Sequence, residues 1–513
     1  MNSSTYTMSD ATTAKGLLAS LGSALTIALA TAGVVAALHG AFAPTAALAE
    51  EREVMAYSYD AAGAATPYYT TDDAISAGYE GKTIYLDCDW MFTGTMTVAD
   101  SKSLTINMNG HKITSQGGGS VIRMYEGSDL TLEGGSTRSM AYTGYDAAER
   151  KEISCTVDAG GLITGGHDTS DAGGILMDAG SHLTLDNVAV AGNLGGEAGG
   201  VYVKGDCTID MKNGASIEHN RGDAGGVYVN NQDVNINMDN ASISYNYACL
   251  YGGGVYSNAD ATRIVMENNS AIDGNTAREG GGVCFFYSFY NLVSNDGTGS
   301  VSNNKATEYG GGGICVNKSD YQENQGEIRG LNICGNSTVS KGGGIAAEQN
   351  YVRVSYCKIS GNSSGNDGGG IYFARNHCSI TGCTITSNVC STKYETREGG
   401  GVFVASDDDS TWGRSSSNLL NLSGKCIIKG NTRSSDGSAD DLFLSQANVL
   451  RAYIVGGVDE GSSVGVRCSS EDDKQVGKDL TTYVEGTYYS DLSGYVVGRE
   501  SSGDLMQRNI AAC

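Results

Sequence analysis

The feature that most constrains the fold is a repeat in which a β-branched residue stands three positions before an asparagine. The nine asparagines are Asn193, Asn220, Asn246, Asn275, Asn304, Asn336, Asn362, Asn388 and Asn431. Eight of them are followed by two glycines and a Val or Ile, and these blocks recur every 26 to 31 residues. A period of this length is typical of stacked supersecondary units rather than of one compact core.

Apolar and polar residues alternate on both sides of each asparagine, which is the periodicity of β-strands. After the two glycines, for example, Val201 and Val203 are predicted to point inward and Tyr202 outward. Each repeat therefore contributes at least two strands, and a third, more variable strand is expected in segments such as 183–185 and 352–354. Repeated strands with common inward columns predict an all-β chain that folds as a parallel β-helix solenoid of about a dozen coils.

Asparagine and glycine are predicted to form two different bends of each coil. The asparagine amide can hydrogen-bond to the amide of the next coil, and its short side chain tolerates a left-handed backbone, so we expect an asparagine ladder along the axis. The glycines suit the other bend, because a Cβ would crowd backbones that repeat about every 4.8 Å. Exposed coil ends would be adhesive edges, so both ends are expected to carry caps.

Four regions are predicted along the chain: residues 1–49 as a signal peptide, 50–103 as an N-terminal cap with the first strands, 104–445 as the β-helix repeats, and 446–513 as a β-rich C-terminal cap. The signal peptide rests on Lys15, on the apolar run that follows it, and on Ala47-Leu48-Ala49. That run is long enough to span a bilayer, so an uncleaved N-terminal anchor is the alternative. The mature chain is expected to have no membrane span and to be secreted or located at the cell surface.

The surface is predicted to be acidic. The 513 residues include 33 Lys and Arg against 58 Asp and Glu, which gives a net charge of -25. Such a surface repels nucleic acid, and no basic patch is visible in the sequence. Nucleic acid is therefore excluded as a partner.

The 14 cysteines follow the repeat, and disulfides are permitted outside the cytoplasm. Cys357, Cys383 and Cys426 each stand five residues before a ladder asparagine, and the favoured interpretation is a column of buried thiols that act as small apolar side chains. Cys284 and Cys315 share another column on consecutive coils. Because neighbouring strands lie about 4.8 Å apart, this pair is the candidate disulfide.

A family resemblance is carried by two segments. The first is Gly192-Asn193 followed by Ala198-Gly199-Gly200-Val201-Tyr202-Val203, and the second is the opening Leu104-Thr105-Ile106-Asn107-Met108-Asn109-Gly110. They resemble bacterial right-handed β-helix surface proteins, including polymorphic outer membrane and adhesin-like repeat proteins of the pectate-lyase-like superfamily. The resemblance covers residues 83–445 and implies a right-handed coil. It implies no single activity, because that superfamily contains lyases, glycosidases and non-catalytic adhesins.

Three tyrosines are the first candidate ligand-binding residues. Tyr202, Tyr228 and Tyr256 follow Gly-Gly-Val on consecutive coils, and a flat aromatic strip of this kind could stack against sugar rings. The alternative, which is favoured, is that the rings only pack on one another and shield the sheet.

Trp412, in the loop 405–418 beside the acids of 407–409, is the fourth candidate binding residue. Carboxylates beside an aromatic ring are what a glycosidase cleft requires, although three adjacent acids are typically solvated.

A column of acids stands four residues before the Val or Ile of each block, at Asp171, Glu197, Asp223, Glu279, Asp367 and Glu398. Calcium could bind such a row, but a solvated acidic edge is favoured, because Tyr251, Gly310 and Lys341 interrupt the row. No catalytic residue, metal ligand or cofactor is assigned, and calcium is retained only as a candidate ion.

These patterns predict an exported, non-catalytic β-helix protein, adhesin-like, which binds extracellular glycans or host or matrix proteins. The alternative is a carbohydrate-active enzyme, a polysaccharide lyase or glycoside hydrolase, acting on an extracellular polysaccharide. The enzyme would need two carboxylates about 5 to 9.5 Å apart in a cleft. A passive envelope spacer is the third interpretation.

Overall fold

The computed structural model describes residues 53–317, 326–348, 351–374, 377–391, 398–406, 418–434, 437–445, 452–468, 474–500 and 502–509. The chain divides into two compact units, Met1–Glu53 and Val54–Cys513, and every described strand belongs to the second. The predicted signal peptide lies outside the described residues. Across the described ranges, no helix is both long enough and apolar enough to cross a membrane.

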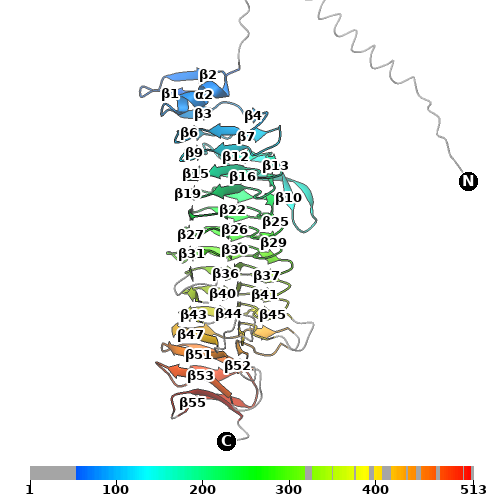
Figure 1. Cartoon of the computed structure of the whole chain (residues 1–513), viewed down its shortest axis with the longest axis vertical. Helices are drawn as coiled ribbons and strands as arrows, with labels where there is room; N and C mark the ends of the chain where they lie inside the picture. The colour runs from blue at the N-terminus through cyan, green and yellow to red at the C-terminus, as the bar shows by residue number, and fades with distance from the viewer. Residues whose placement is uncertain are drawn as a thin grey trace, which may run out of the picture. The chain divides into compact units, whose positions relative to one another are not determined.

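The second unit is a parallel β-solenoid of about 13 turns, whose strands stack one above another (Figure 1). One turn consists of β23 (Asp233–Asp239), β24 (Ser242–Ser244), β25 (Tyr247–Ala248) and β26 (Val255–Asn258). β27 (Ala261–Glu267) begins the next turn and pairs in parallel with β23. The predicted parallel solenoid is therefore confirmed. The two-residue strands of the β25 type were not predicted, because two residues are too short to show an alternation.

The longest strands of successive turns form one sheet, called here the long-strand sheet. Its members include β9 (Asp129–Glu133), β15 (His182–Asp186), β19 (Cys207–Lys212), β23, β27, β31 (Phe289–Val293), β35 (Gly326–Arg329), β39 (Val352–Ser355), β43 (Cys378–Thr381), β47 (Asn418–Gly424) and β51 (Ala452–Val458). Consecutive members pair in parallel from β9 to β51. The register therefore aligns equivalent side chains of every turn into straight rows.

The interior is a single apolar column shared by all turns. The predicted inward residues Ile243, Ile272 and Ile359 have no exposed surface. One continuous cluster of buried side chains extends from Ala56 to Leu505. Burial of apolar surface along this column stabilises the fold by about 25 cal/mol per Å² and is the main favourable contribution to folding.

The predicted asparagine ladder is confirmed. The Asn304 Nδ2 donates to Asn336 Oδ1 at 3.0 Å and to the Ile272 carbonyl at 2.9 Å. Its Oδ1 accepts from the backbone N–H of Asn275 at 2.9 Å and from the Asn275 Nδ2 at 3.0 Å. The pattern repeats from Asn193 to Asn431 with little or no exposed surface. Each amide thus satisfies buried backbone groups of the neighbouring turns.

One part of the asparagine prediction was wrong. The left-handed backbone belongs to the residue before the ladder asparagine, as in Gly192 (φ 66°), His219 (φ 51°) and Tyr245 (φ 54°). The ladder asparagines are not among the positive-φ residues of the described turns. The preceding residue makes the bend, and the asparagine is left free to direct its amide along the axis.

The two glycines are required by close approach rather than by an unusual φ. A Cβ on Gly225 would lie 2.3 Å from the Gly253 carbonyl oxygen, and a Cβ on Gly226 would lie 2.5 Å from the Gly254 oxygen. Both distances are shorter than any van der Waals contact. The sequence-based explanation of crowding at this corner is therefore confirmed.

The cysteine column forms a second, shorter ladder. Cys357, Cys383 and Cys426 are at most 1% exposed, as predicted for buried thiols. In addition, the Cys357 N–H donates to Cys383 Sγ at 3.4 Å, and the Cys426 N–H donates to the Ser462 Oγ at 3.1 Å. This column therefore accepts a backbone N–H from the preceding turn, which a purely apolar side chain would leave unpaired.

Non-parallel elements lie at both ends of the stack (Figure 1). At the first end, β1 (Ala56–Tyr59) pairs antiparallel with β2 (Ala65–Tyr68), and α2 (Thr71–Gly78) begins after Thr70, whose Oγ1 accepts the Asp73 N–H. At the other end, β55 (Tyr495–Arg499) and β56 (Leu505–Asn509) are antiparallel. Parallel pairing extends from β3 (Thr83–Leu86) to β54 (Tyr488–Ser490), on both sides of the predicted repeats 104–445.

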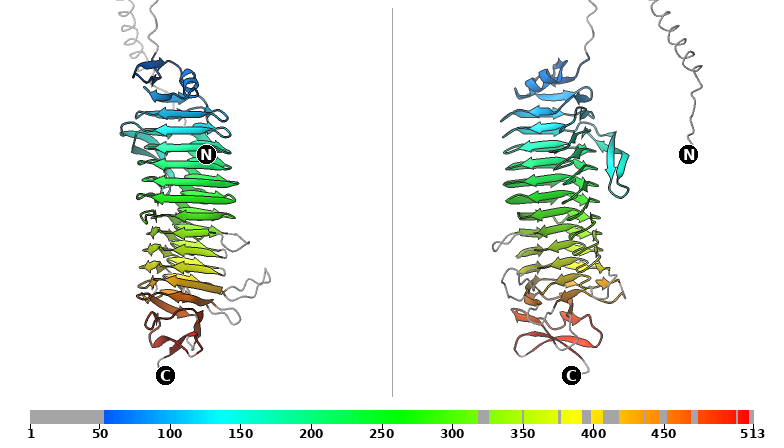
Figure 2. Two further views of the ribbon diagram at one scale, coloured as in Figure 1. Left: turned by 90° about the vertical axis from the view of Figure 1, so that its left-hand side faces the viewer. Right: turned by 45° about the vertical axis from the view of Figure 1, so that its right-hand side comes forward.

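A hairpin that the repeat did not predict projects from the stack (Figure 2, cyan). It consists of β10 (Arg138–Asp146) and β11 (Lys151–Ala159). Its Tyr142 packs against Leu162 and the alanines of β16 (Val188–Ala191), and the Tyr142 hydroxyl donates to Glu218 Oε1 at 2.7 Å. The hairpin thus covers apolar side chains on the outside of the early turns.

The ladder gives a testable prediction. Asn304→Ala removes the partners of the buried Asn275 N–H and Ile272 carbonyl, and each unpaired group costs about 1–3 kcal/mol. We expect the free energy of unfolding to fall by about 2–6 kcal/mol, measured by urea denaturation followed by circular dichroism. The control is Asn303→Gly, at the exposed left-handed neighbour, which should change stability little. Equal stability of Asn304→Ala and the parent would show that the ladder does not hold this corner.

Candidate functional site

The outer face of the long-strand sheet carries two adjacent rows of side chains that together form the candidate site. The polar row consists of side chains directly opposite one another on β27 to β47: Arg263, Asn291, Glu327, Arg353, Ser379 and Asn421. The aromatic row lies two residues earlier and consists of Phe289, Tyr351 and His377, continued by the aliphatic Leu419 and, on the following turn, by Tyr453. Rings therefore border hydrogen-bonding groups on the turns of Asn291, Arg353 and Ser379.

The two rows border a hollow of about 320 Å³. It is lined by Tyr351, Arg353, His377, Ser379, Leu419, Asn421 and Val455. The Tyr351 and His377 rings stack with centroids 5.0 Å apart and planes 8° apart. The hollow thus has an aromatic and aliphatic wall beside guanidinium, hydroxyl and amide groups, which is the composition of a small-molecule site.

The backbone beneath these rings is unusual. Tyr351 (φ 62°) and His377 (φ 61°) are left-handed, whereas the equivalent positions two residues before the paired Asp129 and His182 are Gly127 (φ 65°) and Gly180 (φ 73°). A left-handed residue with a side chain costs about 1–2 kcal/mol. Glycine would meet the backbone requirement at lower cost, so the two rings are retained against a conformational penalty, as is common at functional sites.

These residues were not identified from the sequence. They come from three turns, Tyr351 and Arg353 from one, His377 from the next and Asn421 from the third. The paired Ser379 and Asn421 are separated by a long insertion that hides their alignment. A usable signal was present nonetheless: Tyr351 and His377 occupy a turn position that is Gly127 and Gly180 in two earlier turns.

The predicted tyrosine strip exists as a stack. Tyr202, Tyr228 and Tyr256 lie on paired positions of β18 (Val201–Lys204), β22 (Val227–Asn230) and β26. Their successive ring centroids are 4.9 Å apart. Tyr202 and Tyr228 are only 6% and 9% exposed, because they also pack against a column of alanines. Packing along the sheet accounts for the strip, and its role in binding a ligand stays a prediction.

The other predicted positions differ in what the structure shows of them. Cys284 and Cys315 are directly opposite on β30 (Val283–Phe286) and β34 (Ile314–Asn317), as the repeat predicts. Both are free thiols, the Cys315 Sγ donates to Glu279 Oε1 at 3.2 Å, and the disulfide stays a prediction. Trp412 and the acids of 407–409 lie outside the described residues.

The acid column is not the uniformly solvated edge that the sequence favoured. Glu279 and Asp367 are only 9% and 8% exposed. Burial, followed by the charges of Asp223 and Asp171, raises the pKa of Glu197. Among the described residues, no three His, Cys, Asp or Glu side chains converge to hold a metal ion. Calcium therefore stays a candidate ion on the sequence alone.

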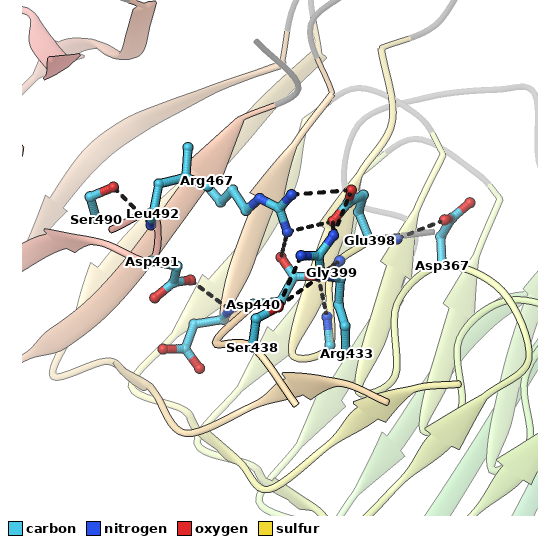
Figure 3. A network of polar contacts seen from close by, with 12 residues as sticks. Asp367, Glu398, Gly399, Arg433, Ser438, Asp440, Arg467, Ser490, Asp491 and Leu492 are labelled. Carbon is cyan, nitrogen blue, oxygen red and sulfur yellow. Dashed lines mark hydrogen bonds and ion pairs between the residues drawn. The ribbon is translucent and has the colours of Figure 1, made fainter. Parts of the chain in front are cut away.

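A network of acids and arginines lies at the late end of that column (Figure 3). The Glu398 carboxylate is 3.2 Å from Arg433 Nη1 and 2.8 Å from Arg467 Nη1, which is also 3.9 Å from Asp440 Oδ1. Burial, and then the charge of Glu398, raises the pKa of Asp440 to about 7. Two carboxyls thus share one guanidinium, but Asp440 has no exposed surface and cannot contact a polysaccharide in this conformation.

The asparagine ladder ends at two further carboxyls. Asp441 Oδ1 accepts from the backbone N–H and from the Nδ2 of Asn431, at 2.7 and 2.9 Å. The Asp441 N–H in turn donates to Asp491 Oδ2 at 2.7 Å. Burial, followed by the Asp441 charge, raises the pKa of Asp491 to about 8. At neutral pH, Asp491 therefore carries a proton in the folded chain.

The two raised values predict how stability depends on pH. The unfolded chain releases the Asp440 and Asp491 protons near pH 3.8, whereas the folded chain keeps them until about pH 7 and 8. The folded state therefore binds more protons between these values, and the contribution of these groups to stability falls as pH rises.

Asp491→Asn tests this dependence, because an amide keeps the hydrogen-bonding shape without ionising. We expect the parent and the variant to melt at similar temperatures at pH 3, below the pKa of the unfolded chain, and the variant to melt at the higher temperature at pH 9. Thermal melts at intervals between these values give the difference directly. Parallel pH profiles of the two proteins would contradict the assignment.

Comparison of the chain with protein-family models, with curated proteins and with solved structures found no match. The chemistry of the described side chains therefore carries the functional argument.

Proposed function

We propose that this chain is an exported, non-catalytic binding protein, secreted or held at the cell surface, that attaches in an adhesin-like manner to extracellular glycans or to host or matrix proteins. The proposal includes removal of residues 1–49 as a signal peptide, a right-handed coil, and kinship with bacterial β-helix surface proteins. These parts are supported by the Ala47-Leu48-Ala49 motif and by the Gly-Gly-Val-Tyr-Val repeats.

The observation that carries the proposal is the pairing of the aromatic row with the polar row. A sugar ring has apolar C–H faces and hydroxyl edges, so it is recognised by an aromatic face together with neighbouring hydrogen-bonding groups. Phe289 is 53% exposed, and Tyr351 and His377 line the hollow beside Ser379 and Asn421. The side chains required for a ring and for its hydroxyls are thus present on one face.

The repeat of the turns favours an extended ligand. Strands of the sheet lie about 4.8 Å apart, which is close to the length of one residue in an extended β-linked glycan. A glycan that lies along the solenoid axis would therefore pass one polar-row side chain on each turn, with a ring beside it on the turns of Phe289, Tyr351 and His377. Because the backbone is fixed by the ladder and by the shared interior, little ordering entropy is lost when such a ligand binds.

The strained rings allow function to be separated from stability. In Tyr351→Gly/His377→Gly, the left-handed backbone is relieved, so the melting temperature should stay the same or rise. Glycan binding should fall by about tenfold or more, because each stacked ring contributes about 0.5–1.5 kcal/mol. The measurement is a glycan array followed by calorimetry on the ligands found.

Tyr245→Gly is the matched control, since Tyr245 is also a left-handed, 51% exposed aromatic but lies at another corner. It should leave glycan binding unchanged. If the double variant and the parent bind every glycan equally, the aromatic row is not the binding surface.

The convergence of Glu398 and Asp440 on Arg467 favours one second candidate, a carbohydrate-active enzyme. Because Asp440 is fully buried, we expect no turnover. Incubation with extracellular polysaccharides should yield neither new reducing ends nor unsaturated products. Product formation that is lost in Glu398→Gln would instead establish the enzyme.

A further inference from the structure

We propose that the hollow between Tyr351 and Val455 binds a sugar that carries a carboxylate, and that Arg353 binds that carboxylate. This inference rests on the proposed function and specifies its ligand. The class follows from the charge, the geometry and the size of the hollow.

The charge of the hollow is opposite to that of the chain. Acids outnumber Lys and Arg by 58 to 33 in the sequence. Within the described part of the chain, the seven residues that line the hollow nevertheless include Arg353 and contain neither Asp nor Glu. In an otherwise acidic protein, a concave site of this composition is complementary to an anionic group.

The position of Arg353 suits a planar anion beside neutral donors. It lies directly opposite Ser379, and Asn421 follows on the next turn. A guanidinium has five N–H donors in a planar fork, so it can keep a protein partner and still donate two parallel hydrogen bonds to a carboxylate. The Ser379 hydroxyl and the Asn421 amide are placed to bind hydroxyls of the same ring.

The acid nearest to Arg353 in register has other partners. Glu327 is opposite Arg353 on β35. Its Oε1 accepts the Ser355 hydroxyl at 2.7 Å, and its Oε2 lies 3.5 Å from Arg329 Nε. The Glu327 carboxylate is therefore held by Ser355 and Arg329, which are not among the described residues that line the hollow.

The remaining wall and the volume specify a ring rather than a simple ion. Tyr351, His377, Leu419 and Val455 provide apolar surface, which an inorganic anion would leave unused. The volume of about 320 Å³ is at the small end of ligand sites, which suits one or two sugar rings. The combination selects a ligand with both an apolar ring face and a carboxylate.

The test uses the full mature chain and matched pairs of ligands. Two carboxylated probes, 3′-sialyllactose and a hyaluronan tetrasaccharide, are each compared with their methyl esters by calorimetry. We expect at least one acid form to bind, and its ester to bind about tenfold more weakly, because a charge-assisted hydrogen bond is lost. The two arms distinguish a sialic acid from a hexuronic acid.

Arg353→Gln should reduce the affinity for the acid form to that for the ester and leave the ester unchanged. Arg278→Gln is the matched control, because Arg278 also carries a guanidinium but pairs with Glu308 and does not line the hollow. Arg353→Lys, which keeps the charge but loses the fork, should give intermediate affinity. Should Arg353→Gln fail to fold, the comparison of acid with ester on the parent protein still decides.

Equal binding of acid and ester by the parent would overturn this inference and leave the proposed function intact, as would selective binding of neutral glycans. Absence of binding to every probe would also overturn it. The proposed function fails separately, if neither the glycan array nor a panel of matrix proteins detects a ligand.

Discussion

The structure depends on the buried amide ladder, because it fixes the register in which the turns stack. Each ladder asparagine pairs with groups of the turns on either side and has almost no contact with water. A shift of one turn against the next would leave these polar groups unpaired in an apolar interior. The same register aligns the outer side chains, so the polar and aromatic rows follow from an interaction that lies on the far side of the backbone.

Much of the architecture could be predicted because the same pattern of inward aliphatic residues, asparagine and paired glycines recurs in many turns. The inward column that includes Ile243, the paired amides and the crowded glycine corner were all confirmed. The left-handed residue was placed one position too late, because an asparagine can adopt that conformation but here a neighbour does. The hairpin of β10 and β11 occurs only once among the described turns, so it could not be predicted from a repeated pattern.

The candidate site was less predictable than the fold for a physical reason. Its residues come together through register, and the insertions between turns hide register in the sequence. Ser379 and Asn421 are neighbours in space but are separated by residues 392–397 and 407–417, which break the spacing. By contrast, the Tyr202 and Tyr228 strip was visible from regular spacing, and it proves to be mostly covered by its own packing. Residues at regular spacing therefore mark positions required for packing of the solenoid, whereas the residues of the candidate site lie where the spacing is irregular.

Asp441 stands where another asparagine would continue the ladder, and this carboxylate determines where the ladder, and with it the number of stacked turns, ends. A side-chain amide both accepts and donates hydrogen bonds, whereas the carboxylate oxygens of Asp441 only accept them. Each ladder asparagine can therefore be followed by another asparagine. Asp441 ends the ladder, because its carboxylate cannot donate a hydrogen bond to a further turn. Insertion or deletion of one complete repeat before Asn431 would lengthen or shorten the solenoid by one turn and leave the Asp441 end of the ladder intact. Reach is thus a trait that can be altered in whole steps without redesigning the end.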